Sequence, residues 1–89
     1  MVLRRSVVIP NSRGLHARAA AKLVALAERY SACVNVLRDG QSVPAVSIMG
    51  LMMLAAGQGS KLRFSVRGKE CAAMLGEMEA LFARKFDEA

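Results

Sequence analysis

The chain has a single histidine, His16, which stands where a strand-like run ends and a helix-like run begins. A neutral imidazole nitrogen is a nucleophile that can carry a phosphoryl group. The first N–H groups of a helix have no acceptor inside the helix and lie at the positive end of its dipole, so those of Ala17, Arg18 and Ala19 would bind an anion. The planar guanidinium of Arg18 suits phosphate geometry and offsets part of its charge of about −2. This spacing indicates phosphoryl chemistry at His16, although a lone histidine near a helix start is more often a capping or surface residue.

The elements on either side of His16 place it at a helix start. An apolar run stops at Pro10, the turn-forming residues 11–14 follow, and a stretch rich in strong helix formers comes next. We expect a strand over residues 2–9 and a helix over residues 17–29. The apolar side of that helix would consist of Ala20, Leu23, Val24 and Ala27.

Turn residues and periodicity predict the remaining elements. Strands over residues 32–37 and 42–46 flank Asp39-Gly40, a favourable hairpin turn, and residues 47–54 indicate a short helix. Residues 61–67 alternate strictly, with Leu62, Phe64 and Val66 on one face of a strand. A long amphipathic helix is expected over residues 70–86, with the apolar residues Cys71, Met74, Leu75, Met78, Leu81, Phe82 and Phe86 on its buried side.

The order of these elements, βαββαβα, predicts an α+β fold. One face of a four-stranded antiparallel sheet would be covered by three helices and the other would face water, which makes an open-faced β-sandwich. A chain of 89 residues with 54% hydrophobic residues has enough apolar material for one core. We therefore expect a single domain over residues 1–89.

Two segments resemble motifs of one protein family. Residues 11–22, Asn-Ser-Arg-Gly-Leu-His-Ala-Arg-Ala-Ala-Ala-Lys, resemble the active-site motif of the histidine-containing phosphocarrier (HPr) family of the bacterial phosphoenolpyruvate-dependent phosphotransferase system. Residues 47–54, Ser-Ile-Met-Gly-Leu-Met-Met-Leu, resemble the segment around that family's regulatory serine, at about the expected separation from the histidine. The similarity runs from about residue 2 to residue 86.

The resemblance implies a phosphoryl carrier rather than an enzyme, with the open-faced sandwich as its fold. His16 would accept the group from an upstream, phosphoenolpyruvate-charged enzyme I and pass it to a downstream enzyme IIA, with Arg18 stabilising the phosphate. No cofactor and no metal are implied. The pathway would be sugar uptake or the nitrogen-related branch of the system. Ala19 stands where many members have proline, and this departure, shared with some relatives of the nitrogen-related branch, leaves the two pathways open.

Ser47 precedes an apolar helical run, where a serine is ordinarily an N-cap. The resemblance implies a second role, regulatory phosphorylation of this residue by a serine kinase, with a phosphorylase to reverse it. Val46 stands where many members have lysine, so recognition by such a kinase is open.

Three of the six methionines lie on one side of the short helix predicted after Ser47. They would be core residues in most proteins, but leucines compete for the inward side, and a short helix cannot bury both faces in so small a domain. Flexible thioethers suit a surface that meets several partners. The resemblance implies a docking role for Ile48, Met49, Met52 and Met53.

The formal net charge of +6 also fits a small basic nucleic-acid-binding domain. The basic residues form no dense run, however, and the aromatic residues Tyr30, Phe64, Phe82 and Phe86 form no stacking motif. We therefore expect no specific nucleic-acid partner, and a positive surface would equally suit acidic proteins. A regulatory module that keeps the fold to bind another protein is the other alternative, against which the presence of His16 argues.

Cys33 and Cys71 are too few for a disulfide framework and, with one histidine, make no plausible zinc site, so we expect two buried thiols. The N-terminal residues do not resemble a signal peptide, and no apolar run approaches the ~20 residues that cross a bilayer. We expect a cytoplasmic monomer with no membrane partner.

Overall fold

The computed structural model describes residues 1–88. Its elements, in chain order, are the strand β1 (Val2–Val8), the helix α1 (Ala17–Ala27), the strands β2 (Cys33–Arg38) and β3 (Gln41–Pro44), the helix α2 (Ile48–Met53), the strand β4 (Lys61–Arg67), the helix α3 (Cys71–Ala83) and a 3₁₀ turn η1 (Lys85–Asp87). The expected order βαββαβα is confirmed, with η1 added after the last helix.

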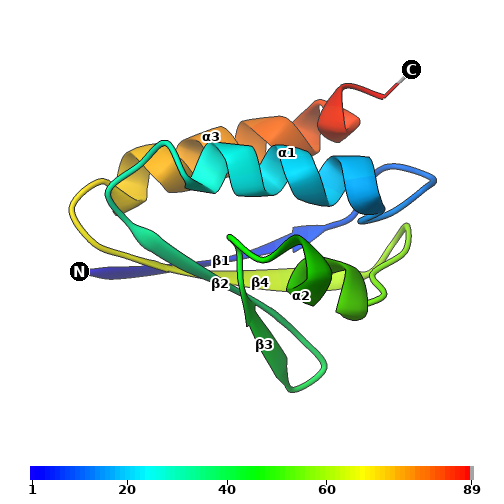
Figure 1. The fold of residues 1–89 in the computed structure, drawn as a ribbon, viewed down its shortest axis with the longest axis horizontal. Helices are drawn as coiled ribbons and strands as arrows, with labels where there is room; N and C mark the ends of the chain where they lie inside the picture. The colour runs from blue at the N-terminus through cyan, green and yellow to red at the C-terminus, as the bar shows by residue number, and fades with distance from the viewer. Residues whose placement is uncertain (89) are drawn as a thin grey trace.

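The strands form one four-stranded antiparallel sheet in the order β1-β4-β2-β3 (Figure 1). The central strand β4 alternates as predicted, because Leu62, Phe64 and Val66 are fully buried while its charged side chains are exposed. Each buried large apolar side chain of this kind contributes about 1.5–3 kcal/mol to folding. The β2–β3 turn has positive φ at Asp39 (48°) and Gly40 (82°), as a tight two-residue hairpin requires.

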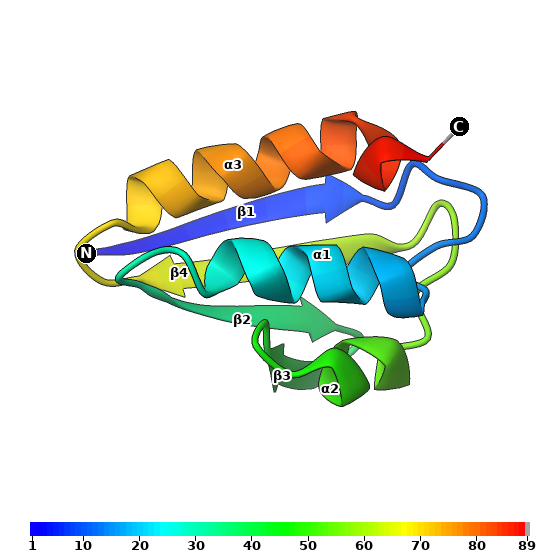
Figure 2. The same cartoon turned by 45° about the horizontal axis from the view of Figure 1, so that its top comes forward.

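Helices cover one face of the sheet. The helices α1 and α3 lie side by side over it, and α2 packs against α1 and β3 (Figures 1 and 2). The predicted apolar side of α1 is buried, and the ring of Phe82 from α3 meets Phe64 of β4 edge to face at 5.3 Å between centroids. The opposite face of the sheet carries exposed cations such as Arg4 and Arg63. The predicted open-faced β-sandwich is confirmed.

Several elements end earlier than their patterns predict. The helix α1 ends at Ala27: the N–H of Glu28 still bonds four residues back, to the Val24 carbonyl at 3.0 Å, whereas that of Arg29 bonds three residues back, to the Leu26 carbonyl at 3.1 Å. The strand β3 stops at Pro44, where the chain turns and the N–H of Ser47 bonds to the Pro44 carbonyl at 3.1 Å.

The prediction that the last helix runs to residue 86 is wrong. The helix α3 ends at Ala83, and Lys85, Phe86 and Asp87 have positive φ of 55°, 56° and 61°. Phe86 nevertheless stays in the core, with its ring centroid 4.7 Å from that of Phe82. The helical spacing therefore predicted the burial of Phe86 correctly. It did not predict that the backbone leaves the helix and turns toward α1.

The prediction that both cysteines are buried is half wrong. Cys71, the first residue of α3, is buried, but Cys33 is exposed, because its neighbour Val34 takes the core side of β2 and strand side chains alternate. Among residues 1–88, no three His, Cys, Asp or Glu side chains gather in a way that could hold a metal ion. None of the helices described is long and apolar enough to span a membrane.

Candidate functional site

The loop that leads from β1 to His16 is fixed by the loop before β4. The N–H of Ile9 bonds to the Ser60 carbonyl, and the N–H of Leu15 bonds to the Ala56 carbonyl, both at 2.9 Å. At Gly14, where φ is 66°, an added Cβ would lie 2.4 Å from the Ala56 oxygen. Only glycine permits this close approach, so Gly14 fixes the path on which His16 follows two residues later.

Asn11 holds the same loop from inside. Its side chain is 3% exposed, and its Nδ2 donates to the Gly14 carbonyl at 2.8 Å. The N–H of Gly14 bonds in return to the Asn11 carbonyl at 3.2 Å. These two bonds close a local turn over residues 11–14, which adds to the contacts with the loop before β4.

His16 is the N-cap residue of α1. Its backbone is extended (φ −75°, ψ 177°), its carbonyl accepts the N–H of Ala20 at 2.8 Å, and its ring does not cap the helix. Within residues 1–88, the N–H groups of Ala17, Arg18 and Ala19 have no acceptor, and the first turn carries no acidic residue. The predicted place of His16 is confirmed, and an anion at this helix start would meet three free donors.

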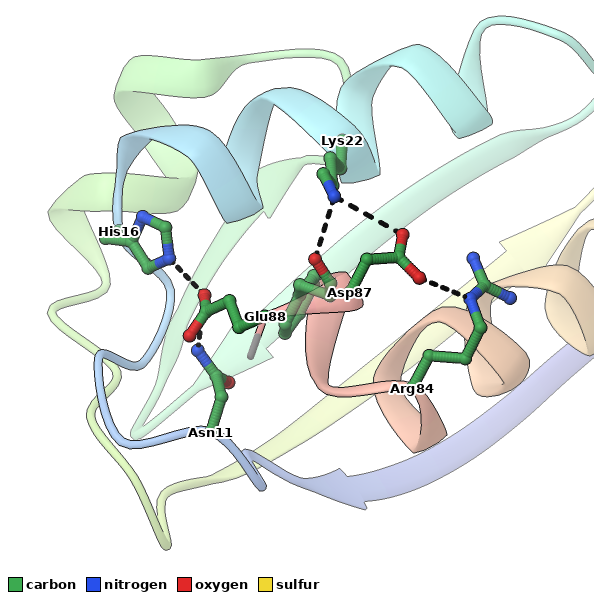
Figure 3. A network of polar contacts seen from close by, with 7 residues as sticks. Asn11, His16, Lys22, Arg84, Asp87 and Glu88 are labelled. Carbon is green, nitrogen blue, oxygen red and sulfur yellow. Dashed lines mark hydrogen bonds and ion pairs between the residues drawn. The ribbon is translucent and has the colours of Figure 1, made fainter.

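The ring of His16 is held by a residue from the far end of the chain. Its Nε2 contacts Oε2 of Glu88, and the same oxygen accepts a hydrogen bond from Asn11 Nδ2 at 3.1 Å (Figure 3). The side chains of His16 and Glu88 are only 14% and 19% exposed. The hydrogen bond with His16 is the largest influence on the Glu88 carboxyl, whose pKa is lowered as a result.

Sequence reasoning missed Glu88. It lies 72 residues from His16, beyond the end of the predicted helix, and no spacing rule connects the two positions. The one signal available was an acidic pair, Asp87-Glu88, directly after the last apolar residue of the helical pattern. That signal places carboxylates near the core boundary but does not say what they meet.

Arg18 is exposed and lines, together with Glu88, a surface hollow of about 300 Å³. The hollow brings together three cations from α1 and the loop before it and two carboxylates from residues 87–88 at the end of the turn η1. Its lining residues are Ser12, Arg13, Arg18, Lys22, Phe86, Asp87 and Glu88. Arg18 has no ion pair within residues 1–88, so its guanidinium is available to an incoming anion.

Lys22 joins α1 to the turn η1. Its Nζ donates to the Phe86 carbonyl at 2.9 Å and lies 3.3 Å from Asp87 Oδ2, while Arg84 Nε donates to Asp87 Oδ1 at 2.9 Å (Figure 3). The hydrogen bonds from Arg84 and then Lys22 lower the pKa of the Asp87 carboxyl. These contacts fix the segment that carries Glu88.

Ser47 caps the helix α2, as predicted. Its Oγ accepts the N–H of Gly50 at 2.9 Å, and its carbonyl accepts the N–H of Leu51 at 3.0 Å. The preceding residue, Val46, is 56% exposed. The cap is confirmed, whereas the regulatory role of Ser47 stays a prediction.

The helix α2 exposes the methionine surface, which consists of Ile48, Met49, Met52 and Met53. Met49 and Met53 are each 74% exposed, whereas Leu51 on the inner side is fully buried. Arg38 Nη1 donates to the Leu54 carbonyl at 2.8 Å and fixes the end of this helix. The predicted outward orientation is confirmed, and the docking role stays a prediction.

Known proteins resemble this chain along most of its length. A family model described as the phosphorylation site of the HPr component of the phosphotransferase system matches residues 3–84. Over 87 residues the chain is 44% identical to the phosphocarrier protein HPr of Cupriavidus necator, and the alignment covers 98% of each chain. It is 40% identical over 87 residues to the phosphocarrier protein NPr of Shewanella violacea, which covers 98% of this chain and 96% of that relative.

Solved structures show the same architecture. The crystal structure of HPr from Thermoanaerobacter tengcongensis superposes with a TM-score of 0.93 at 34% sequence identity, and the match covers 98% of each chain. Some relatives that are similar to this chain in sequence are named HPr and others NPr. The structural match covers nearly the whole chain.

Proposed function

This chain belongs to the HPr family of the phosphoenolpyruvate-dependent phosphotransferase system, and from that premise we propose that His16 carries a phosphoryl group between two partner proteins. The donor would be an enzyme I charged by phosphoenolpyruvate, and the acceptor an enzyme IIA. The chain would act as a covalent relay rather than as a complete enzyme, as one phosphocarrier domain over residues 1–89 in the cytoplasm.

The observation that carries this proposal is the position of His16 as the N-cap of α1. A phosphoryl group on the ring would lie near the three free N–H groups of Ala17, Arg18 and Ala19, at the positive end of the helix dipole. The exposed guanidinium of Arg18 would supply the remaining charge-assisted hydrogen bonds. These donors stabilise the charge on the equatorial oxygens while the group is transferred in line from one nitrogen to another.

A phosphoryl carrier must also release the group that it holds. Every ~1.4 kcal/mol by which the protein stabilises phosphohistidine but not the transition state slows the next transfer about tenfold. A few backbone donors and one solvent-exposed arginine suit this requirement better than an enclosed phosphate cage would. The exposed side chain of Arg18 agrees with such a loose site.

The methionine surface would dock the successive partners. Its four side chains are the exposed face of α2, which packs against α1, the helix that His16 begins. Thioether side chains adapt to differently shaped partners, so one surface can serve both donor and acceptor. The two partners would then bind in turn rather than together.

Ser47 would serve as a regulatory site for a serine kinase and a phosphorylase. Its Oγ already lies 2.9 Å from the N–H of Gly50, so a phosphate there would stay close to helix donors. Its charge would adjoin the apolar methionine surface and disfavour docking rather than folding. Val46 supplies no positive charge beside this serine, and any kinase would need to recognise the site without one.

Intact-mass measurement tests the proposal. The chain is incubated with phosphoenolpyruvate and its cognate enzyme I, then measured before and after brief acid treatment, with His16→Ala in parallel. One added phosphoryl mass that acid removes and the variant lacks would support a phosphohistidine carrier. No added mass would contradict it and favour a regulatory or binding module centred on Ser47.

A further inference from the structure

Glu88 makes a direct polar contact with the ring of His16 and has no part in the function proposed above. Its Oε2 meets Nε2 of the ring and also accepts from Asn11, a residue that is 3% exposed (Figure 3). Because the ring and the carboxylate are both mostly shielded from water, the contact is stronger than an exposed ion pair would be. The second ring nitrogen, Nδ1, points away from Glu88.

Four interactions hold Glu88 in place. Lys22 donates to the Phe86 carbonyl, Asp87 is bonded by both Lys22 and Arg84, and the Phe86 ring is buried. The backbone reaches this arrangement through three successive non-glycine residues with positive φ, a conformation that is unfavourable for residues with a side chain. Such a strained run persists only where surrounding contacts determine it, so the carboxylate is directed to the ring by the fold.

The contact determines the protonation pattern of the ring. An ionised carboxylate can only accept hydrogen bonds, so Nε2 must carry the proton that it donates to Glu88. The lone pair of the neutral ring is then on Nδ1. We infer that Glu88 is a positioning residue for His16, which holds the Nε2–H tautomer, presents Nδ1 to the phosphoryl donor and faces the charge that develops on the ring.

The inference rests on the proposed function and completes its chemistry. The Nδ1 lone pair forms the new bond to phosphorus, while the bond from phosphorus to the donor nitrogen breaks and its electron pair leaves with that nitrogen. The proton stays on Nε2, so the phosphorylated ring is cationic and its N–H points at the Glu88 carboxylate. A buried carboxylate that orients an imidazole and stabilises its cationic form acts in the same way in hydrolase triads.

A small-molecule phosphoryl donor tests the role of Glu88 without any orientation that a protein partner would impose on the His16 ring. Potassium phosphoramidate would be reacted with protein containing ¹⁵N-histidine, and ³¹P–¹⁵N coupling would show which ring nitrogen holds phosphorus. We expect Nδ1 alone in the unaltered chain and in Glu88→Gln, whose amide oxygen still accepts from Nε2–H. Glu88→Ala should label both nitrogens, with at least about a tenth of the phosphorus on Nε2.

Transfer from enzyme I gives the second readout. Loss of the facing charge should slow phosphorylation of Glu88→Gln about three- to tenfold, a factor of ten being 1.4 kcal/mol. Glu77→Gln is the matched control, because Glu77 is exposed on α3 and should behave as the unaltered chain in both experiments. Thermal unfolding and amide spectra verify that each variant is folded.

Exclusive Nδ1 labelling of a folded Glu88→Ala variant would overturn the inference, and so would an unchanged rate in Glu88→Gln. Either result would leave the carrier function standing, because the unaltered chain would still accept phosphate from enzyme I. Failure of the unaltered chain itself to accept phosphate at His16 would instead contradict the proposed function.

Discussion

The Nζ atom of Lys22 lies 2.9 Å from the carbonyl oxygen of Phe86, which ties the middle of α1 to the turn that follows α3. The cation therefore satisfies a main-chain acceptor of the turn η1. It also approaches Asp87, so one lysine fixes both the backbone and a side chain of this turn. The position of Glu88 beside His16 depends on this link.

The Asp87 contacts make stability depend on pH. Hydrogen bonds from Arg84 and Lys22 lower the pKa of Asp87 in the folded protein, so its contribution is fully present above the unfolded-state pKa of about 4 and is lost as pH falls through the lower folded-state value. The difference in thermal midpoint between the unaltered chain and Asp87→Asn should be largest near pH 6 and should shrink below about pH 4. A difference that stays constant down to about pH 2 would show that the ionised carboxylate does not stabilise the fold.

Arg18→Ala should slow phosphoryl transfer and leave the fold intact. The guanidinium is exposed and unpaired within residues 1–88, so its removal breaks no structural contact, whereas a charge-assisted hydrogen bond to the phosphoryl group disappears. We expect kcat/KM with enzyme I to fall about tenfold or more, with Arg18→Lys between the two.

Arg63→Ala provides the control for that measurement. Arg63 is exposed on the open face of β4. Its substitution by alanine removes the same charge on the side of the sheet that the helices do not cover. Equal losses in Arg18→Ala and Arg63→Ala would mean that net charge, and not a specific contact at the site, determines the rate.

Ser47→Ala should destabilise the protein by about 1 kcal/mol. The hydroxyl accepts the N–H of Gly50, and loss of such a cap typically costs this amount, whereas Ser47→Asn can restore the acceptor. Urea denaturation at constant m-value measures the difference. Equal midpoints for the unaltered chain and Ser47→Ala would show that the cap contributes nothing measurable.

Substitutions of exposed and of buried residues in α2 should distinguish an effect on partner docking from an effect on stability. Met49→Ala and Met53→Ala should change stability by less than about 0.5 kcal/mol, because both side chains are 74% exposed, yet they should raise the KM of enzyme I several-fold at unchanged kcat. Leu51→Ala should instead cost about 2–5 kcal/mol, because that side chain is fully buried. An unchanged KM in the double variant Met49→Ala/Met53→Ala would place docking elsewhere.

Local rules accounted for most of the fold and for the start of the site. The alternation of residues 61–67, the Asp39-Gly40 turn, the Ser47 cap and the place of His16 each depend on neighbouring residues in the chain, so sequence patterns report them directly. The outward methionines also followed from competition between the two faces of a short helix.

Features that depend on distant residues could not be predicted in this way. The helical period continues through Phe86, and it does not reveal that Lys22, 64 residues away, binds the Phe86 carbonyl of a turned backbone. The contact of Glu88 with His16 could not be predicted for the same reason, because 72 residues separate the two. The exposure of Cys33 was a local error, because alternation along β2 with Val34 on the core side already places it on the open face.

A chase of labelled phosphate tests the relay most directly. The chain is charged with ³²P from labelled phosphoenolpyruvate and enzyme I, freed of both, and mixed with an enzyme IIA acceptor, with His16→Ala carried through the same steps. We expect acid-labile ³²P to enter only the unaltered chain and then to move to the acceptor as the chain loses it. Label that stays on the chain, or that also enters His16→Ala, would contradict the claim that His16 carries a phosphoryl group from one partner to the next.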